Sequence, residues 1–275
     1  MTDDLIDRYL DFQRSRSFSA MTVKRRRQAL IGFERHLHGV GLLDATAEDV
    51  EAWLRTKSSP RTRHAYRSDL AGFYSWAVRR HHATTNPVAD TGSIRLPKPL
   101  PRPIGPEVHV ALMTGPLRTR RMVALGMYAG LRCAEIAVLD GSDLWTHRDP
   151  PLLMVRDGKG GKDRVVAMHP TLVELFHGAQ PAGPLFPGRE RGTVAAGTVS
   201  ALLSRHLHRC GIDATAHQLR HTFGTEMTRA ARGNLVAVAA AMGHGSMQTT
   251  RGYVGWDGDS AVIIAAMFPD GDEAA

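Results

Sequence analysis

Hydrophobic residues recur every three or four positions along the first 90 residues, which is the spacing of one face of an α-helix. The apolar positions of four expected helices are Leu5, Tyr9 and Phe12; Val23, Leu30, Phe33 and Leu37; Val50, Trp53 and Leu54; and Tyr66, Leu70, Phe73 and Ala77. The second helix is expected over residues 19–38, and Thr46 is suited to cap the third. Ser59 followed by Pro60 predicts the start of the fourth, because proline fits the first helical position. This part of the chain therefore reads as all helical.

Prolines divide the chain. Six of them fall within residues 86–106, a density that stops a helix and favours an extended segment. We expect a helical domain over residues 1–90, a proline-rich linker over 91–106 and a second domain over 107–275.

The second domain has a mixed pattern. Helical spacing covers residues 107–113, 117–129, 133–138, 171–177, 198–209, 217–229 and 235–242. Residues 152–156 and 164–168 look like strands, and the turn formers at 157–163 between them predict a β-hairpin. The expected fold class is mostly α, of α+β type: an N-terminal helical domain plus a domain of helices with a small antiparallel hairpin or sheet.

Charge and composition narrow the possible functions. The chain carries 35 Lys and Arg against 27 Asp and Glu, a formal net charge of +8 that suggests a polyanionic partner, most often nucleic acid. The longest apolar runs have eight residues, whereas a membrane-spanning helix needs about 20. Two cysteines cannot form a disulfide framework or a cysteine-based zinc finger. We therefore expect a cytoplasmic, nucleoid-associated protein without a membrane segment.

Basic residues on two of the N-terminal helices are candidate contacts to a phosphate backbone. They are Lys24, Arg25 and Arg26 in the second helix and Arg61, Arg63 and Arg67 in the fourth. Residues 1–95 carry five more basic than acidic residues. A solvated charged face is the alternative interpretation of the run at 24–27.

Four local clusters in the second domain carry the possible chemistry. They are Gly130-Leu131-Arg132-Cys133-Ala134-Glu135, the hairpin with Lys159 and Lys162, His217-Gln218-Leu219-Arg220-His221, and Met242-Gly243-His244 followed nine residues later by Tyr253. Each has an ordinary structural reading by itself. A pair such as Arg132 and Glu135 is usually a surface ion pair, for example.

Together, in this order and spacing, the clusters resemble the tyrosine recombinases, also called the phage integrase family. The resemblance extends over nearly the whole chain and points to a simpler, Xer-like layout without an arm-site-binding domain. It implies catalytic roles for Arg132, Lys159, His217, Arg220, His244 and Tyr253, and a supporting role for Glu135. It also implies strand exchange through a 3′-phosphotyrosine, with no cofactor, metal or ATP.

The chemistry of these residue types agrees with that implication. A free phenol has a pKa near 10, so Tyr253 needs a base to accept its proton, and His217 is the candidate. Arg132 and Arg220 can hold phosphate oxygens in bidentate geometry. The leaving 5′ oxygen needs a proton, which we assign to Lys159 rather than Lys162 because the first hairpin lysine is the catalytic one in the family. His244 can donate a hydrogen bond to the phosphate, and Glu135 is expected to orient Arg132.

The expected partner is double-stranded DNA with paired half-sites, bound by a tetramer of this chain. The apolar segment 261–268 is expected to dock on a neighbouring subunit, and packing on its own subunit is the alternative. Two other functions remain open at this point. A type IB topoisomerase-like enzyme would use the same residue types to nick and reclose one strand, and a DNA-binding protein without catalysis would need none of them.

Overall fold

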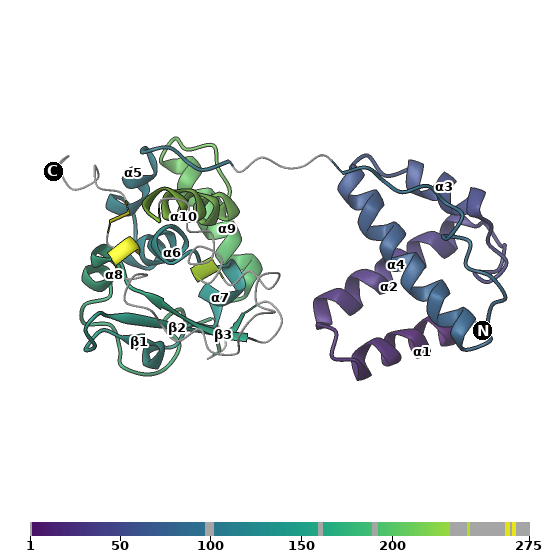
Figure 1. The fold of residues 1–275 in the computed structure, drawn as a ribbon, viewed down its shortest axis with the longest axis horizontal. Helices are drawn as coiled ribbons and strands as arrows, with labels where there is room; N and C mark the ends of the chain where they lie inside the picture. Colours follow the sequence, from purple (N-terminus) through teal and green to yellow (C-terminus); the bar gives the residue numbers. More distant parts are fainter. Residues whose placement is uncertain are drawn as a thin grey trace. The chain divides into compact units, whose positions relative to one another are not determined.

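The computed structural model describes residues 2–96, 102–158, 162–188, 192–231, 241–242, 262–264 and 266–267. The chain divides into two compact units, Met1–Pro99 and Leu100–Ala275 (Figure 1). Among the described residues, none of the helices has the length and apolar character needed to span a membrane.

The first unit is built from four helices: α1 (Thr2–Ser15), α2 (Ala20–His36), α3 (Ala47–Arg55) and α4 (Pro60–Arg79). Local chemistry explains where these helices start. The Ser19 side chain accepts a hydrogen bond from the backbone N–H of Thr22, and Thr46 forms a capping box with Asp49. Pro60 occupies the first turn of α4, as its fixed φ favours.

The apolar faces expected from the sequence meet in an aromatic core. Tyr9, Phe33, Phe73 and Tyr74 are fully buried, and the Tyr9 and Phe73 rings lie edge to face with centroids 5.4 Å apart. Burial of each such side chain contributes roughly 1.5–3 kcal/mol, so this cluster supplies much of the unit's hydrophobic stabilisation.

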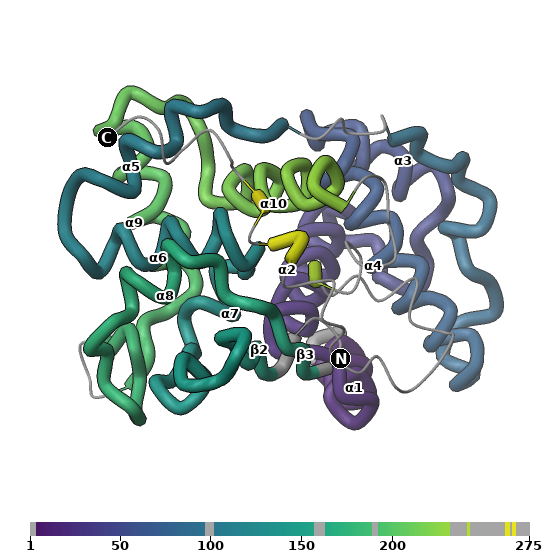
Figure 2. The backbone as a smooth tube through the Cα atoms, turned by 60° about the vertical axis from the view of Figure 1, so that its left-hand side comes forward, coloured from purple at the N-terminus to yellow at the C-terminus, as the bar shows by residue number. Residues whose placement is uncertain are grey.

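The second unit combines helices with a three-stranded sheet. Its elements are α5 (Val108–Met113), α6 (Leu117–Tyr128), α7 (Cys133–Ala137), the 3₁₀ turn η1 (Gly141–Asp143), β1 (Leu144–Trp145), β2 (Leu152–Gly158), β3 (Lys162–Ala167), α8 (Pro170–Leu175), α9 (Ala196–Arg209) and α10 (Ala216–Ala230). The strands are antiparallel in the order β1-β2-β3, and Leu152 pairs with Ala167. Helix α10 packs on α6, and α7 packs on β2 (Figures 1 and 2). The fold class expected from the sequence is thereby confirmed.

The sheet differs from the expected hairpin in two respects. The strands reach further toward the turn, because Gly158 pairs with Lys162 across a bulge that follows Val155. Backbone pairing does not require apolar side chains, so the polar turn formers concealed this extension. The short strand β1 was also missed, since two residues are too few to show an alternating pattern.

The proline-rich segment is attached to both units. Val88 is buried in the first core, and the Arg67 guanidinium donates to the carbonyls of Val88 and Thr91 at 3.0 and 2.8 Å. Further along, Ile104 is buried in the second core, and its N–H donates to the Thr222 hydroxyl at 2.8 Å. Both ends of the segment are therefore held by specific contacts.

Two sequence expectations fall mostly outside the described residues. Of the helix expected over 235–242, only Ala241 and Met242 are described, and both are helical. Of the tail, residues 262–264 are helical, and Ile264 and Met267 are buried in the core of the second unit. His169 Nε2 lies 3.3 Å from the Met267 carbonyl oxygen, to which it can donate.

Candidate functional site

A tight turn after α6 delivers Arg132 to the start of α7. Gly130 has φ +61°, a conformation that favours glycine, and a Cβ there would lie 2.4 Å from the Phe223 ring. Arg132 then precedes α7, and its side chain is 26% exposed. The glycine of the first motif is thus explained by the close packing of α10 against this turn.

Arg220 on α10 reaches the same turn. Its side chain is buried and donates hydrogen bonds to the carbonyls of Gly130 and Met242. Helices α6 and α10 approach closely at Gly126, where a Cβ would lie 3.1 Å from the Leu219 side chain. This packing brings together two arginines that are 88 positions apart in the sequence.

The electrostatics of the site favour an anionic ligand. Burial, together with the positive charges of Arg132 and Arg164, lowers the pKa of Arg220 to about 10. Arg220 therefore stays protonated at neutral pH, although its burial and the neighbouring positive charges cost free energy. A phosphate bound between the guanidinium groups would offset that cost and accept charge-assisted hydrogen bonds.

Glu135 lies on α7 and organises the neighbouring arginines. Its carboxylate accepts from the Arg132 backbone N–H and from Arg132 Nη1, both at 2.8 Å. It also accepts two bonds from Arg164, at 3.0 and 2.9 Å. Burial alone would raise the pKa of Glu135, but the bonds and charges of Arg164 and Arg132 lower it to about 2. Glu135 is therefore an ionised anchor rather than a proton donor.

His217 lies one helical turn before His221 on α10. The centroids of the two rings are 4.7 Å apart and the ring planes are nearly perpendicular. The His217 residue is exposed. Partial desolvation, followed by the charges of His221, Arg220 and Arg132, lowers the pKa of His217. A histidine that is neutral and exposed at pH 7 is suited to accept a proton.

Three of the expected catalytic residues, Lys159, His244 and Tyr253, lie outside the described residues. Of the hairpin lysines, Lys162 begins β3. The structure thus brings Arg132, Glu135, His217 and Arg220 into one region. In the described part of the chain, no group of three or more His, Cys, Asp or Glu side chains could hold a metal ion.

Arg164 is the member of this region that sequence reasoning missed. In its strand it follows Lys162 and Asp163 and precedes Val165 and Val166, and the sequence alone shows no partner for its charge. Its position five residues after Lys159, on the strand that leaves the hairpin, was the available signal.

The basic residues of the first unit have unequal roles. Arg25 makes two bonds to the buried Asp69, at 2.9 and 2.7 Å, and Arg26 lies 3.6 Å from the same carboxylate. Arg25 and Arg26 thereby link α2 to α4, and the bonds of Arg67 to Val88 and Thr91 attach the segment after α4 to that helix.

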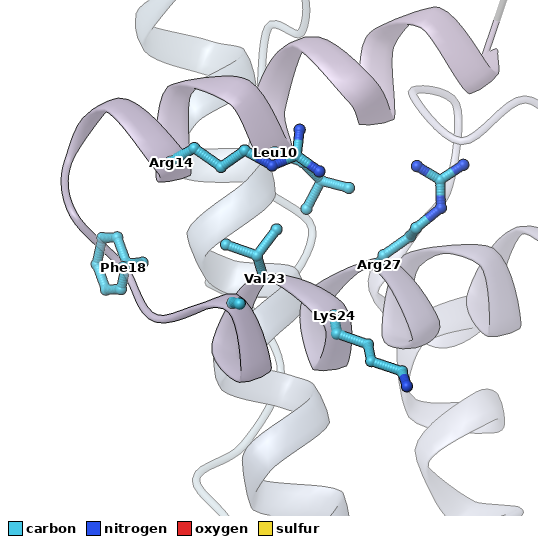
Figure 3. Close-up of a pocket in the computed structure, with 7 residues that line it drawn as sticks. Leu10, Arg14, Phe18, Val23, Lys24 and Arg27 are labelled. Atoms are coloured by element: carbon cyan, nitrogen blue, oxygen red, sulfur yellow. The ribbon is translucent and has the colours of Figure 1, made fainter. Parts of the chain in front are cut away.

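Other candidates remain available to a ligand. Within the described residues, the exposed Lys24 and Arg61 have no hydrogen bond or ion pair. Figure 3 shows Lys24 extending away from a pocket of about 400 Å³ between α1 and α2, while Arg27 extends toward α1, where it pairs with Asp7. Lys24 and Arg61 are therefore the exposed candidates with free charge, whereas Arg63 is half-buried and its Nε has no hydrogen-bond partner among the described residues.

Comparison with known proteins identifies similar chains. The model of the phage integrase family matches residues 108–257, which include all the expected catalytic residues. The tyrosine recombinase XerC of Xylella fastidiosa is 32% identical over 208 residues, 69% of this chain and 68% of that protein. The tyrosine recombinase XerD of Pseudomonas putida is 27% identical and covers 90% of this chain and 91% of its own.

Solved structures agree with these similarities. The integrase from mycobacterium phage Brujita is 30% identical, with a TM-score of 0.57, and the alignment covers 97% of this chain and 93% of that one. A lambda integrase dimer bound to a COC′ core site has a TM-score of 0.72 at 21% identity, with 93% and 79% covered. At that identity the lambda integrase likeness shows a shared fold.

Proposed function

Because this chain belongs to the phage integrase family and is a tyrosine-type site-specific DNA recombinase, we propose that it cuts and rejoins DNA through Tyr253. The Tyr253 oxygen attacks a phosphodiester, forming a 3′-phosphotyrosine and releasing a 5′ hydroxyl. A 5′ hydroxyl of another strand then attacks that bond and releases Tyr253. The phosphotyrosine link conserves the energy of the phosphodiester, so neither ATP nor a metal is required.

The observation that carries this proposal is the convergence of Arg132 and Arg220. The non-bridging phosphate oxygens gain negative charge in the transition state, and fixed guanidinium groups stabilise that charge. Arg220 is buried and held by two backbone carbonyls, while Arg132 is tied to Glu135. Both groups are therefore oriented before DNA arrives, which lowers the reorganisation needed during the reaction.

Proton transfer is assigned to two further residues. His217 accepts the Tyr253 proton, and its lowered pKa keeps it neutral at pH 7. Lys159 donates a proton to the leaving 5′ oxygen, and His244 donates a hydrogen bond to the phosphate. These assignments rest on the match of Gly158–Lys162 and Gly243-His244 to the family's motifs.

The first unit is proposed to grip the DNA backbone, with 1–90 as the core DNA-binding domain, 91–106 as the linker and 107–275 as the catalytic domain. Exposed Lys24 and Arg61 support this role. The substrate is double-stranded DNA with paired half-sites, so the protein acts in the cytoplasm at the nucleoid. A tetramer on DNA is proposed because a lambda integrase of the same fold is described as a tetramer bound to a Holliday junction.

The C-terminal tail is proposed to dock on the next subunit in that tetramer. In the single chain, Ile264 and Met267 are buried in their own unit, which is the alternative stated from the sequence. Identical subunits have identical binding sites, so the tail of a neighbouring subunit can make the contacts that Ile264 and Met267 make within their own unit.

The test is cleavage of a suicide DNA substrate whose scissile 5′ oxygen is replaced by sulfur, a leaving group that departs without protonation. We expect Lys159→Ala to be strongly impaired on the oxygen substrate and restored on the sulfur substrate, with Lys162→Ala as the matched control. Equal defects without rescue would overturn the assignment of Lys159. Relaxed plasmid without recombinant products would favour the topoisomerase-like alternative.

A further inference from the structure

Arg164 is a buried charge that the proposed reaction does not use. Its side chain is 8% exposed and lies on β3 opposite Val155. Burial of a guanidinium is unfavourable unless its N–H groups have hydrogen-bond partners, and here Nε and both Nη atoms have them. Nη1 and Nη2 donate to the two oxygens of Glu135, and Nε donates to the Ala241 carbonyl at 3.2 Å.

The Glu135 carboxylate is shared between two arginines. The oxygens that receive Arg164 also receive the backbone N–H and Nη1 of Arg132. The bidentate bond from Arg164 fixes the plane of the carboxylate, because a fork of two parallel N–H groups permits one orientation. The direction of the Arg132 guanidinium follows from that plane.

The second contact of Arg164 reaches a segment far along the chain. Arg164 holds the carbonyl of Ala241, and Arg220 holds the carbonyl of the next residue, Met242. These residues directly precede Gly243 and His244 in the sequence. One side chain thus links the strand after the hairpin, the helix behind Arg132 and the backbone leading to His244.

We propose that Arg164 is a positioning residue for recombination: through Glu135 it aims Arg132 at the phosphate, and through Ala241 it fixes the backbone that leads to His244. The proposal rests on the function assigned to Arg132 above. It predicts that Arg164 affects the rate of cleavage more than the affinity for DNA, because it touches neither the substrate nor the reacting atoms.

The groups around Glu135 determine the pH behaviour of the variants. Glu135 faces Arg132 and Arg164. The Glu135 charge also affects the pKa of Arg220, and the Arg132 charge affects the pKa of His217. With Arg164 present, Glu135 has a pKa of about 2 and stays ionised over the range in which His217 titrates. Without Arg164, burial raises the pKa of Glu135 and only the bonds from Arg132 oppose it. Protonation of Glu135 as the pH falls then releases Arg132.

The experiment compares Arg164→Met, Arg164→Lys and the control Arg156→Met in the full chain. Arg156 on the adjacent strand pairs with the buried Asp143 at 2.5 Å, so the control also removes an arginine from a buried carboxylate. Single-turnover cleavage of a suicide substrate and affinity for a half-site are measured across pH 5–8. A displaced catalytic group typically slows reaction about 100-fold, so we expect that loss in Arg164→Met with affinity within about threefold.

A double variant separates positioning from a general structural effect. In Arg164→Met we expect the loss of cleavage at low pH to depend on protonation of two groups, Glu135 and His217. Adding Glu135→Gln to this variant should leave a loss that depends on protonation of His217 alone. The two defects are then non-additive, because Arg164 acts through Glu135. Arg164→Lys retains the charge but not the fork and is expected to show the same defect while remaining folded.

Several results would overturn the proposal. They are cleavage by Arg164→Lys within about threefold of wild type, a defect in the control as large as that of Arg164→Met, or additive effects of Arg164→Met and Glu135→Gln. A loss of half-site affinity equal to the loss of cleavage would show that Arg164 serves the fold or the DNA contact instead. None of these results would by itself contradict cleavage by Tyr253.

Discussion

At the scale of single residues, the site is defined by how each charge is held. Arg220 is buried and bound to two carbonyls, whereas Arg132 is partly exposed and bound to one carboxylate. A lysine cannot reproduce either arrangement, because it is a point charge without a planar fork. Arginine is therefore required for geometry as well as for charge.

Arg132→Lys tests that requirement. We expect cleavage to fall about 100- to 1000-fold, the usual loss when one preorganised donor to a developing negative charge is removed. Half-site binding should change little, since the positive charge remains. Single-turnover kinetics and a binding titration measure the two effects, and near wild-type cleavage would show that geometry at Arg132 is unimportant.

Glu135 gives a prediction about stability and pH. Its pKa is about 2 in the folded chain against an ordinary value of 4.5, a difference equivalent to about 3 kcal/mol. A lowered pKa stabilises the fold above the ordinary value, and that stability is lost as the pH falls from 4.5 toward 2. Denaturant unfolding of the wild type and Glu135→Gln should show this pH dependence in the wild type alone. A parallel dependence in both would contradict it.

His217 gives a prediction about activity and pH. A general base must be neutral, and the pKa of His217 lies below its usual 6.5. Cleavage should therefore be retained at pH 6.5 and fall only as the pH drops further. The pH profile of single-turnover cleavage measures this, with His217→Ala expected to lack the acidic limb. An acidic limb centred above pH 6.5 would contradict the assignment.

At the scale of secondary structure, the turn between α6 and α7 connects packing to chemistry. Gly130 lets α6 end against the Phe223 ring of α10, and the same turn sets Arg132 beside Arg220. Substitution there is unfavourable for two reasons, the positive φ and the overlap with the ring.

Gly130→Ala isolates the second reason when compared with Gly178→Ala. Both glycines have positive φ, at +61° and +70°, but a Cβ at Gly178 would meet nothing within 4 Å. Strain at such a φ costs about 1–3 kcal/mol, so both variants should melt lower. We expect Gly130→Ala to lose clearly more stability and also most of its cleavage activity. Equal melting temperatures and intact cleavage would show that the turn tolerates a side chain.

Whether a feature could be predicted from the sequence depends on how far apart along the chain the residues that define it lie. Helices such as α3 could be predicted because Thr46 and the apolar spacing act within one or two turns. The first motif could also be recognised as a cluster in the sequence. The link from Glu135 to Arg164 could not, because it joins a helix and a strand 29 positions apart through side-chain geometry. The strand β1 was missed because its pairing with β2, rather than its own pattern, defines it.

At the scale of the whole molecule, the chain consists of a basic helical unit and a unit that carries the arginine site. The proposed mechanism supplies positive charge from Arg132, Arg220 and Lys159. We therefore expect cleavage to persist in excess EDTA. Loss of cleavage that magnesium or zinc restores would contradict the metal-free mechanism.

The tail gives a second prediction at this scale. Truncation after Gly258 removes Ile264 and Met267 from the core of the second unit. If the tail docks between subunits, the truncated chain should bind one half-site normally and lose cooperative pairing and recombination. Gel shifts on one and two half-sites measure this. Unfolding of the truncated chain, or its normal assembly, would show that the tail is only a local core element.

The most direct test of the central claim is to identify the residue that is covalently bound to DNA. The wild type is trapped on a suicide substrate, digested, and the DNA-linked peptide is identified by mass spectrometry, with Tyr253→Phe as the matched variant. The account predicts a 3′ adduct on the peptide that contains Tyr253, and no adduct in Tyr253→Phe despite wild-type binding. An adduct that survives in Tyr253→Phe, or one mapped to another residue such as the buried Tyr128, would contradict it.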